Sequence, residues 1–311
     1  MPHDHSGHDH HHHPEVTDAT PAFLIGIGLN IAFVVIELIV GLSSSSLALV
    51  SDAGHNAIDV ISLLLALFAF RMLKVKATEN YSYGYKKISI LISLLNAIFL
   101  IVTVGFIFYE GIRRINDPVA VPGKIVSLVA LIGILVNGIS AWLFFKGKEK
   151  DINTRSAYLH MLSDAIVSAG VVIAGIIIYF THWFWLDTAL SFIIGMVILV
   201  ATWRLLSDSI RLALDGTPPN VEMHKIKELV TGFPGVAGMH HIHVWPISSK
   251  ENAMTAHLVV NQNDLLQFEK DKPKLKHALM HLHIHHATFE TETQPCATPD
   301  CKQEEKHDHV H

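Results

Sequence analysis

Two short segments of the chain each place a histidine and an aspartate four residues apart, His55-Asn-Ala-Ile-Asp59 and His160-Met-Leu-Ser-Asp164. On an α-helix, residues i and i+4 lie on one face, about 6 Å apart along the axis. Each pair therefore presents one imidazole and one carboxylate in the same direction. Two such helices facing each other would supply two nitrogen and two oxygen ligands, a tetrahedral set for a divalent metal, with Zn²⁺ the best match.

Both pairs lie in long apolar segments. The chain has 311 residues, of which 50% are hydrophobic and only 16% are charged, and its mean hydropathy is +0.38. Six segments reach the roughly 20 apolar residues that a helix needs to cross a bilayer. They are residues 22–42, 47–71, 88–112, 123–145, 154–180 and 184–206. The sequence predicts an all-α transmembrane six-helix bundle in a lipid bilayer.

Ionisable side chains at membrane depth are costly, and they are functional candidates by default. The predicted spans hold Glu37 and Asp52 in addition to the two pairs. Glu37 either takes part in an ion path or contacts water or a partner helix. Asp52 either belongs to the ion path or is a solvated residue near a helix start. The His–Asp pairs could instead lock the bundle by bonding to each other or to the backbone, but two identical spacings favour a metal site.

Basic residues in short loops predict the orientation, because such residues favour the cytoplasmic side. The loops after the second and fourth spans are rich in Lys and Arg, whereas those after the first and fifth have none. The loop after the third span carries three basic residues, a minority count. We expect both termini in the cytoplasm and the protein in a cell membrane, the inner membrane of a bacterium.

A small soluble domain follows the hinge 214–219, where a glycine and two prolines end the last span. Helical and alternating patterns predict a helix, two strands, a helix and a strand over 220–232, 239–247, 252–260, 264–282 and 284–292. This order indicates a small cytoplasmic α+β (αββαβ) domain. The predicted domains are a disordered His-rich tail, the bundle, the soluble domain and a disordered Cys/His tail, at 1–20, 21–212, 213–293 and 294–311.

Histidine is unusually frequent, with 23 residues. Seven of them lie within residues 3–13 and either collect metal or belong to an expression tag; the interleaved Asp and Gly disfavour a tag. Cys296 and Cys301 are too few for a disulfide framework. They either capture metal, form one local bridge, bridge two subunits or have no role.

Several functional classes are excluded. The net charge of −5 and the high apolar content exclude a nucleic-acid binder, a disordered chain and a coiled coil. The chain has neither an H-E-x-x-H nor a G-x-S-x-G motif, so we expect no enzyme. A membrane receptor that binds metal without moving it remains an alternative to a transporter.

The residues from about 20 to 293 resemble the cation diffusion facilitator family of metal transporters. The resemblance rests on Ser51-Asp-Ala-Gly-His55-Asn-Ala-Ile-Asp59, on the segment from His160 to Ala165, on Leu214 to Pro218 and on the strand Met239 to Trp245. It implies a homodimer that exports a divalent cation in exchange for protons by alternating access. It also implies a transport site at His55, Asp59, His160 and Asp164, and the histidine at 55 favours Zn²⁺ over Cd²⁺, Co²⁺ or Ni²⁺.

The resemblance further implies a cytoplasmic metal site with ligands at His240, His257, His285 and Glu292. Glu290 is the less favoured acid, and the register leaves His285 and His286 as alternatives. Strand alternation predicts His241, His243 and Trp245 on one face of the first strand, with His240, Ile242 and Val244 on the other. His277, His281 and His283 are either exposed residues without a role or further ligands.

Overall fold

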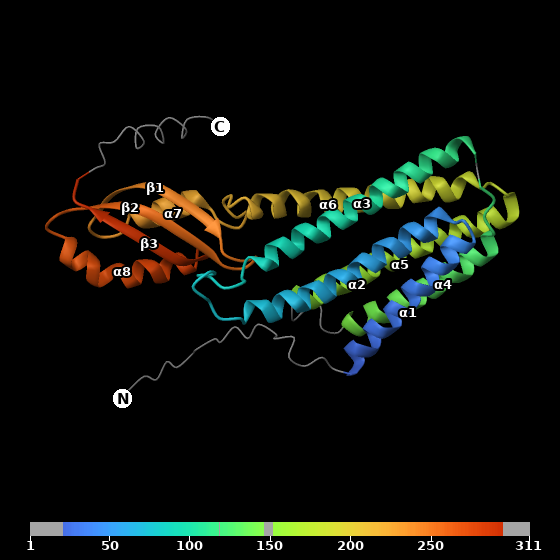
Figure 1. Cartoon of the computed structure of the whole chain (residues 1–311), viewed down its shortest axis with the longest axis horizontal. Coiled ribbons are helices and arrows are strands. Elements are labelled where there is room, and N and C mark those ends of the chain that lie inside the picture. The colour runs from blue at the N-terminus through green and yellow to red at the C-terminus, as the bar shows by residue number, and fades with distance from the viewer. Residues whose placement is uncertain (1–20, 118, 146–151, 295–311) are drawn as a thin grey trace. The chain divides into compact units, whose positions relative to one another are not determined.

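The structure is a computed structural model that describes residues 21–117, 119–145 and 152–294 (Figure 1). The first part of the chain forms six long helices, which overlap the predicted spans. They are α1 (Pro21–Ser43), α2 (Leu47–Leu73), α3 (Ile88–Asn116), α4 (Gly123–Phe145), α5 (Ile152–Thr181) and α6 (Trp185–Ala213). The main difference is at the end of α6, which continues seven residues beyond the predicted 206. The prediction followed apolar length alone, whereas a helix can continue past a bilayer with polar residues such as Arg204 and Asp208, whose side chains lie 3.8 Å apart.

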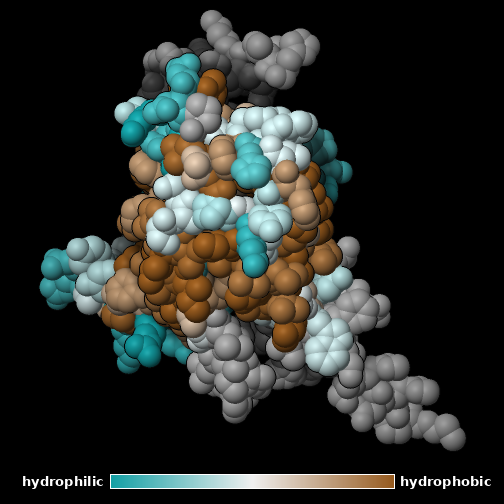
Figure 2. All heavy atoms as spheres, turned by 90° about the vertical axis from the view of Figure 1, so that its right-hand side faces the viewer, coloured by the Kyte–Doolittle hydropathy of each residue, from teal (hydrophilic) through white to brown (hydrophobic). Residues whose placement is uncertain are grey.

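Five helices are apolar enough, over their described residues, to cross a membrane. They are α2, α3, α6, the Gly123–Trp142 part of α4 and the Met161–Thr181 part of α5; the apolar stretch found in α1 is the shorter Asn30–Ser43. Large apolar side chains are exposed along these helices, with Phe180 75% exposed and Trp142 68% exposed. Figure 2 shows hydrophobic residues gathered over much of one face. Such a surface suits lipid and not water.

Residue contacts group the described residues into two compact units, those up to 60 with those from 106 to 195, and those from 61 to 105 with those from 196 onward. In the first unit, α4 packs against α5 and α1. Gly123 and Gly175 make the α4–α5 approach possible, because a Cβ on either glycine would collide with backbone or side-chain atoms of the other helix. Small residues at such crossings let helix backbones approach closely.

The second unit contains an α+β fold with the predicted element order. Its elements are α7 (Met223–Thr231), β1 (Val236–Pro246), β2 (Asn252–Val260), α8 (Leu265–Met280) and β3 (Ile284–Glu292). The sheet has the order β1-β2-β3, in which β2 pairs antiparallel with β1 and parallel with β3. Helix α8 makes the crossover that a parallel pair requires. The core includes Ile226 of α7, Met254 and Leu258 of β2, and Phe268 and Leu275 of α8.

Two irregularities interrupt the ladders of this sheet. On β1 the register shifts between His240 and His243, and His241 has a positive φ of 49°. On β3 the register shifts at the start, where Ile284 pairs with Asn252 and His286 pairs with Ala253. The predicted alternation of β1 is therefore wrong at His241, because a bulge re-aims side chains that a continuous ladder would place on opposite faces.

Candidate metal centres

Helices α2 and α5 bring three of the predicted transport ligands together. His55 Nε2 lies 3.5 Å from Asp59 Oδ2 on the same helix and 3.9 Å from Asp164 Oδ1 on α5. Asp164 is buried, and the other two side chains are about one-quarter exposed. The i, i+4 spacing thus presents one imidazole and one carboxylate to a second helix, as the sequence predicts for this pair.

His160 lies in α5, four residues before Asp164. Its side chain is outside the described part of the structure, so its place among the ligands stays a prediction. The N-terminal histidine tract and Cys296 and Cys301 also lie outside the described residues.

The start of α2 is fixed by an aspartate from α6. Ser46 Oγ donates a hydrogen bond to Asp187 Oδ1 at 2.6 Å, and the Leu47 N–H donates to Asp187 Oδ2 at 2.6 Å. The Ala48 N–H lies 3.4 Å from both carboxylate oxygens. Asp187 therefore satisfies the backbone donors that the first turn of a helix leaves without intrahelical acceptors. This contact sets where α2 begins, and so it sets the depth of His55 two turns later.

The first unit also buries two further acidic side chains, Glu37 and Asp52. Glu37 of α1 is 0% exposed and Asp52 of α2 is 1% exposed. Asn56 Nδ2 donates to Glu37 Oε2 at 3.5 Å, and Ser168 Oγ of α5 donates to Asp52 Oδ2 at 3.1 Å. The alternatives of a solvated Asp52 and a water-contacting Glu37 are therefore wrong. The first turns of α2 are covered by other helices, which apolar length alone does not reveal.

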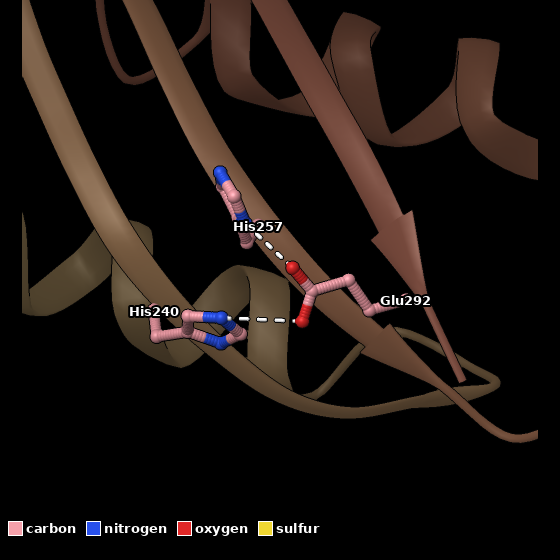
Figure 3. A group of neighbouring side chains, drawn as sticks. All are labelled: His240, His257 and Glu292. Carbon is pink, nitrogen blue, oxygen red and sulfur yellow. Dashed lines mark hydrogen bonds and ion pairs between the residues drawn. The ribbon is translucent and has the colours of Figure 1, made fainter. Parts of the chain in front are cut away.

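The sheet of the second unit holds a cluster with one residue from each strand (Figure 3). His257 Nδ1 of β2 lies 2.6 Å from Glu292 Oε1 of β3, and His240 Nε2 of β1 lies 3.3 Å from Glu292 Oε2. One potential ligand atom from each residue lies within 4.8 Å of the other two. Adjacent ligands of a tetrahedral Zn²⁺ with bonds of about 2.0–2.1 Å are about 3.3 Å apart, so the three donors have a suitable spacing.

Two further residues adjoin this cluster. The His241 ring lies 5.0 Å from the His257 ring and 5.3 Å from the His240 ring, measured between centroids. Glu290 Oε2 lies 3.4 Å from His257 Nε2. Strand alternation did not predict that His241 lies beside His240 and His257, because the bulge on β1 turns it toward those two imidazoles.

The structure does not bring His285 into this cluster, which corrects its expected place there. Residue pairing puts Glu290 opposite His257, so His285 lies five residues earlier on β3, about 16 Å away at 3.3 Å per residue. There its Nδ1 accepts a hydrogen bond from the Asn252 N–H at 3.3 Å. Sequence patterns predict strands well, but the register between two strands depends on how α8 crosses over, and no local pattern gives this.

The fold and the two clusters define a class of protein, a helical membrane protein with a His–Asp cluster between its helices and an α+β domain that carries a His–Glu cluster. Comparison with known proteins supports the same class of protein. Residues 23–212 match the model of the cation efflux transmembrane domain, and residues 218–288 match that of the cation efflux protein cytoplasmic domain. The chain belongs to this family, the cation diffusion facilitators, which confirms the resemblance found in the sequence. It is an integral, multi-pass membrane protein.

Bacterial relatives are similar over nearly the whole chain. The cadmium, cobalt and zinc/H⁺-K⁺ antiporter of Bacillus subtilis is 35% identical, over 97% of this chain and 99% of its own length. The zinc transporter ZitB of Escherichia coli is 36% identical over the full length of both chains. The metal cation efflux system protein CzcD of Cupriavidus metallidurans is 33% identical over 96% of this chain and 93% of its own.

Proposed function

We propose that this protein exports divalent metal cations, zinc foremost, by exchanging them for protons. The observation that carries the proposal is the approach of His55 to both Asp59 and Asp164 between two membrane-depth helices. The names of the relatives, which include zinc, cadmium and cobalt, support the same choice of cargo. Buried ionisable groups of this kind mark ion paths in membrane proteins.

The ligands themselves supply the proton coupling. A metal is bound by neutral imidazole and by ionised carboxylate, so metal binding releases protons and proton binding releases metal. We place His160 as the fourth ligand, one helical turn from Asp164. In alternating access, the site opens to the cytoplasm to load metal and then opens to the outside, where protons displace the metal.

The proposal includes six membrane spans, α1 to α6, with both termini in the cytoplasm of a bacterial cell. The bundle then covers residues 21–212 and the cytoplasmic domain covers 213–293, as the sequence predicts. A domain of this size gains stability from a twin, and the dimer that the family resemblance implies fits this need. We assign His240, His257 and Glu292 as a cytoplasmic site that senses metal and biases the transport cycle.

Flux measurement tests the transport function. Inside-out proteoliposomes with an acidic lumen should accumulate ⁶⁵Zn²⁺, and the protein with Asp164→Asn should not. Asp208→Asn, which changes an aspartate on α6 outside both clusters, is the matched control and should transport as the wild type does. Zinc binding without any gradient-driven uptake would instead favour a receptor, and uptake that survives Asp164→Asn would refute the assigned site.

A further inference from the structure

The second unit carries a group of histidines remote from the His240–His257–Glu292 cluster. Three of them line a surface groove of about 420 Å³ between the end of α8 and the start of β3. These are His277 of α8 and the adjacent His285 and His286 of β3. We propose that this groove is a second divalent-cation site of the α+β domain, with these three imidazoles as ligands.

The bulge on β3 makes such a site possible. Ile284 and Ala287 are both buried, whereas the two histidines between them are both exposed. A regular strand would send one of two adjacent side chains into the core. The register shift adds one residue between the pairs Asn252–Ile284 and Ala253–His286, and in this way it keeps both imidazoles on the surface beside α8. The two histidines that the sequence left as alternatives therefore serve together.

The helix supplies the third donor. His277 lies in the last turn of α8, and the ring centroid of His281 lies 5.3 Å from its own. Histidines at i and i+4 on a helix present two nitrogen donors to one ion, the arrangement that the H-x-x-x-H part of zinc-protease helices uses. His281 lies beside His277 but does not line the groove, so it is a neighbouring donor and not one of the three proposed ligands. Among the described residues, only His240, His257 and Glu292 have three ligand atoms within 4.8 Å of one another, so an ion in the groove would draw the exposed imidazoles together.

The chemistry of the groove indicates the kind of ion. Among the described residues, no carboxylate lines the groove, and Lys276 is the one charged residue of its lining. A neutral, all-imidazole site favours borderline metals such as Zn²⁺, Ni²⁺, Co²⁺ and Cu²⁺ over Mg²⁺ and Ca²⁺. The positive charge of Lys276 opposes a cation, so this site binds more weakly than one with Glu292 among its ligands.

The groove is also in contact with the connection between α2 and α3. The Tyr83 ring of that connection meets the His286 ring edge-on, with centroids 6.1 Å apart. Nearby, Lys86 Nζ lies 2.5 Å from Glu251 Oε2, and the Ser249 N–H donates to Ser89 Oγ at 3.0 Å. A metal that takes up His286 therefore acts next to the point where the α+β domain meets the helices of its own unit.

Site-resolved histidine modification tests the proposal on the full-length protein. Diethyl pyrocarbonate labelling, read by mass spectrometry, is compared across a titration with Zn²⁺ and with Mg²⁺. Zn²⁺ should protect His277, His285 and His286 at a common midpoint, and Mg²⁺ should not. His224, exposed on α7 and remote in sequence from the groove, is the internal control and should be labelled equally throughout.

Three variants decide whether the protection reports one shared ion. His285→Ala should raise the midpoint for His277 and His286 at least tenfold, since even indirect disturbance of a metal ligand costs about 10–100-fold in affinity. Lys276→Ala changes the groove without removing a donor and should leave the midpoint equal or lower. His240→Ala should not move it. Equal labelling with and without Zn²⁺, or protection of His277 that survives His285→Ala unchanged, would overturn the site.

Discussion

Asp187 of α6 holds the N-terminus of α2 through a 2.6 Å hydrogen bond from the Leu47 backbone N–H, across 140 positions of sequence. The contact joins a helix that carries no predicted ligand to the helix that carries His55. Arg114 of α3 accompanies it, with Nη1 4.0 Å from Asp187 Oδ2 and 2.5 Å from the Ser45 carbonyl oxygen. The buried carboxylate is thus compensated by backbone donors and one cation, and it positions the helix of the candidate ligand His55 without touching that residue.

Replacing Asp187 should therefore destabilise the protein and weaken metal binding together. Loss of a helix N-cap costs about 0.5–2 kcal/mol, and Asp187→Ala should fall at the upper end because the buried Ser46 hydroxyl and the Leu47 N–H both lose their acceptor. Asp187→Asn keeps one acceptor and should lose less. Thermal unfolding in detergent measures both variants, with Asp208→Ala as the surface control. An unchanged unfolding temperature in Asp187→Ala would contradict the capping role.

His55 approaches both Asp59 and Asp164, so as a ligand it should matter most for zinc selectivity. His55→Asp replaces an imidazole by a third carboxylate, and oxygen ligands favour harder ions such as Mn²⁺. We expect zinc flux to fall at least tenfold while the ratio of Mn²⁺ to Zn²⁺ transport rises. Competition between the two metals in proteoliposomes measures this ratio. The same substitution at His224 on α7 should change neither value.

Glu292 and Glu290 form a matched pair on β3. Glu292 contacts two imidazoles and is 23% exposed, whereas Glu290 contacts one and is 69% exposed. Glu292→Gln should weaken zinc binding by this cluster by about 10–100-fold, and Glu290→Gln should weaken it less. Protection of His257 against chemical modification reports the site directly. Equal effects of the two substitutions would show that both carboxylates coordinate the metal.

The ion pair between Lys86 and Glu251 should matter more for coupling the α2–α3 connection to the α+β domain than for the stability of the protein. Partly exposed pairs contribute only about 0–1 kcal/mol, and both side chains are more than one-third exposed. Lys86→Ala should therefore leave the unfolding temperature nearly unchanged but alter the rate of zinc uptake. A double-mutant cycle with Glu251→Ala measures the coupling. Purely additive effects on the uptake rate would mean that the contact plays no part in transport.

The sequence predicts most of the local structure here because the local signals are strong. Membrane-length apolar runs indicate the helices, and the H-x-x-x-D spacing alone places His55 and Asp59 on one face. Alternation and turn residues locate β2 and β3 at their observed bounds. These features depend only on neighbours in sequence, so they can be read without knowing how the chain folds back on itself.

The features that the sequence did not predict all depend on distant contacts. The role of Asp187 requires knowing that α6 begins beside the first turn of α2. His241 joins its cluster, and His285 leaves it, because of bulges and register in the sheet. For Glu37 the sequence offered contact with a partner helix as one alternative, and helix patterns did not identify Asn56 as the residue contacted. Each of these outcomes depends on how distant helices and strands pair, and local periodicity does not predict that pairing.

The position of β3 at the edge of the sheet gives Glu290 and Glu292 another consequence. An edge strand offers unpaired backbone groups to any other strand, and proteins discourage such pairing with charged side chains. Here one of those negative charges is also a candidate metal ligand, and zinc would neutralise it. A carboxylate that protects the domain from self-association when metal is scarce would then lose that protective charge when metal is abundant. Zinc excess would thus expose this domain to aggregation through its own sensing residue.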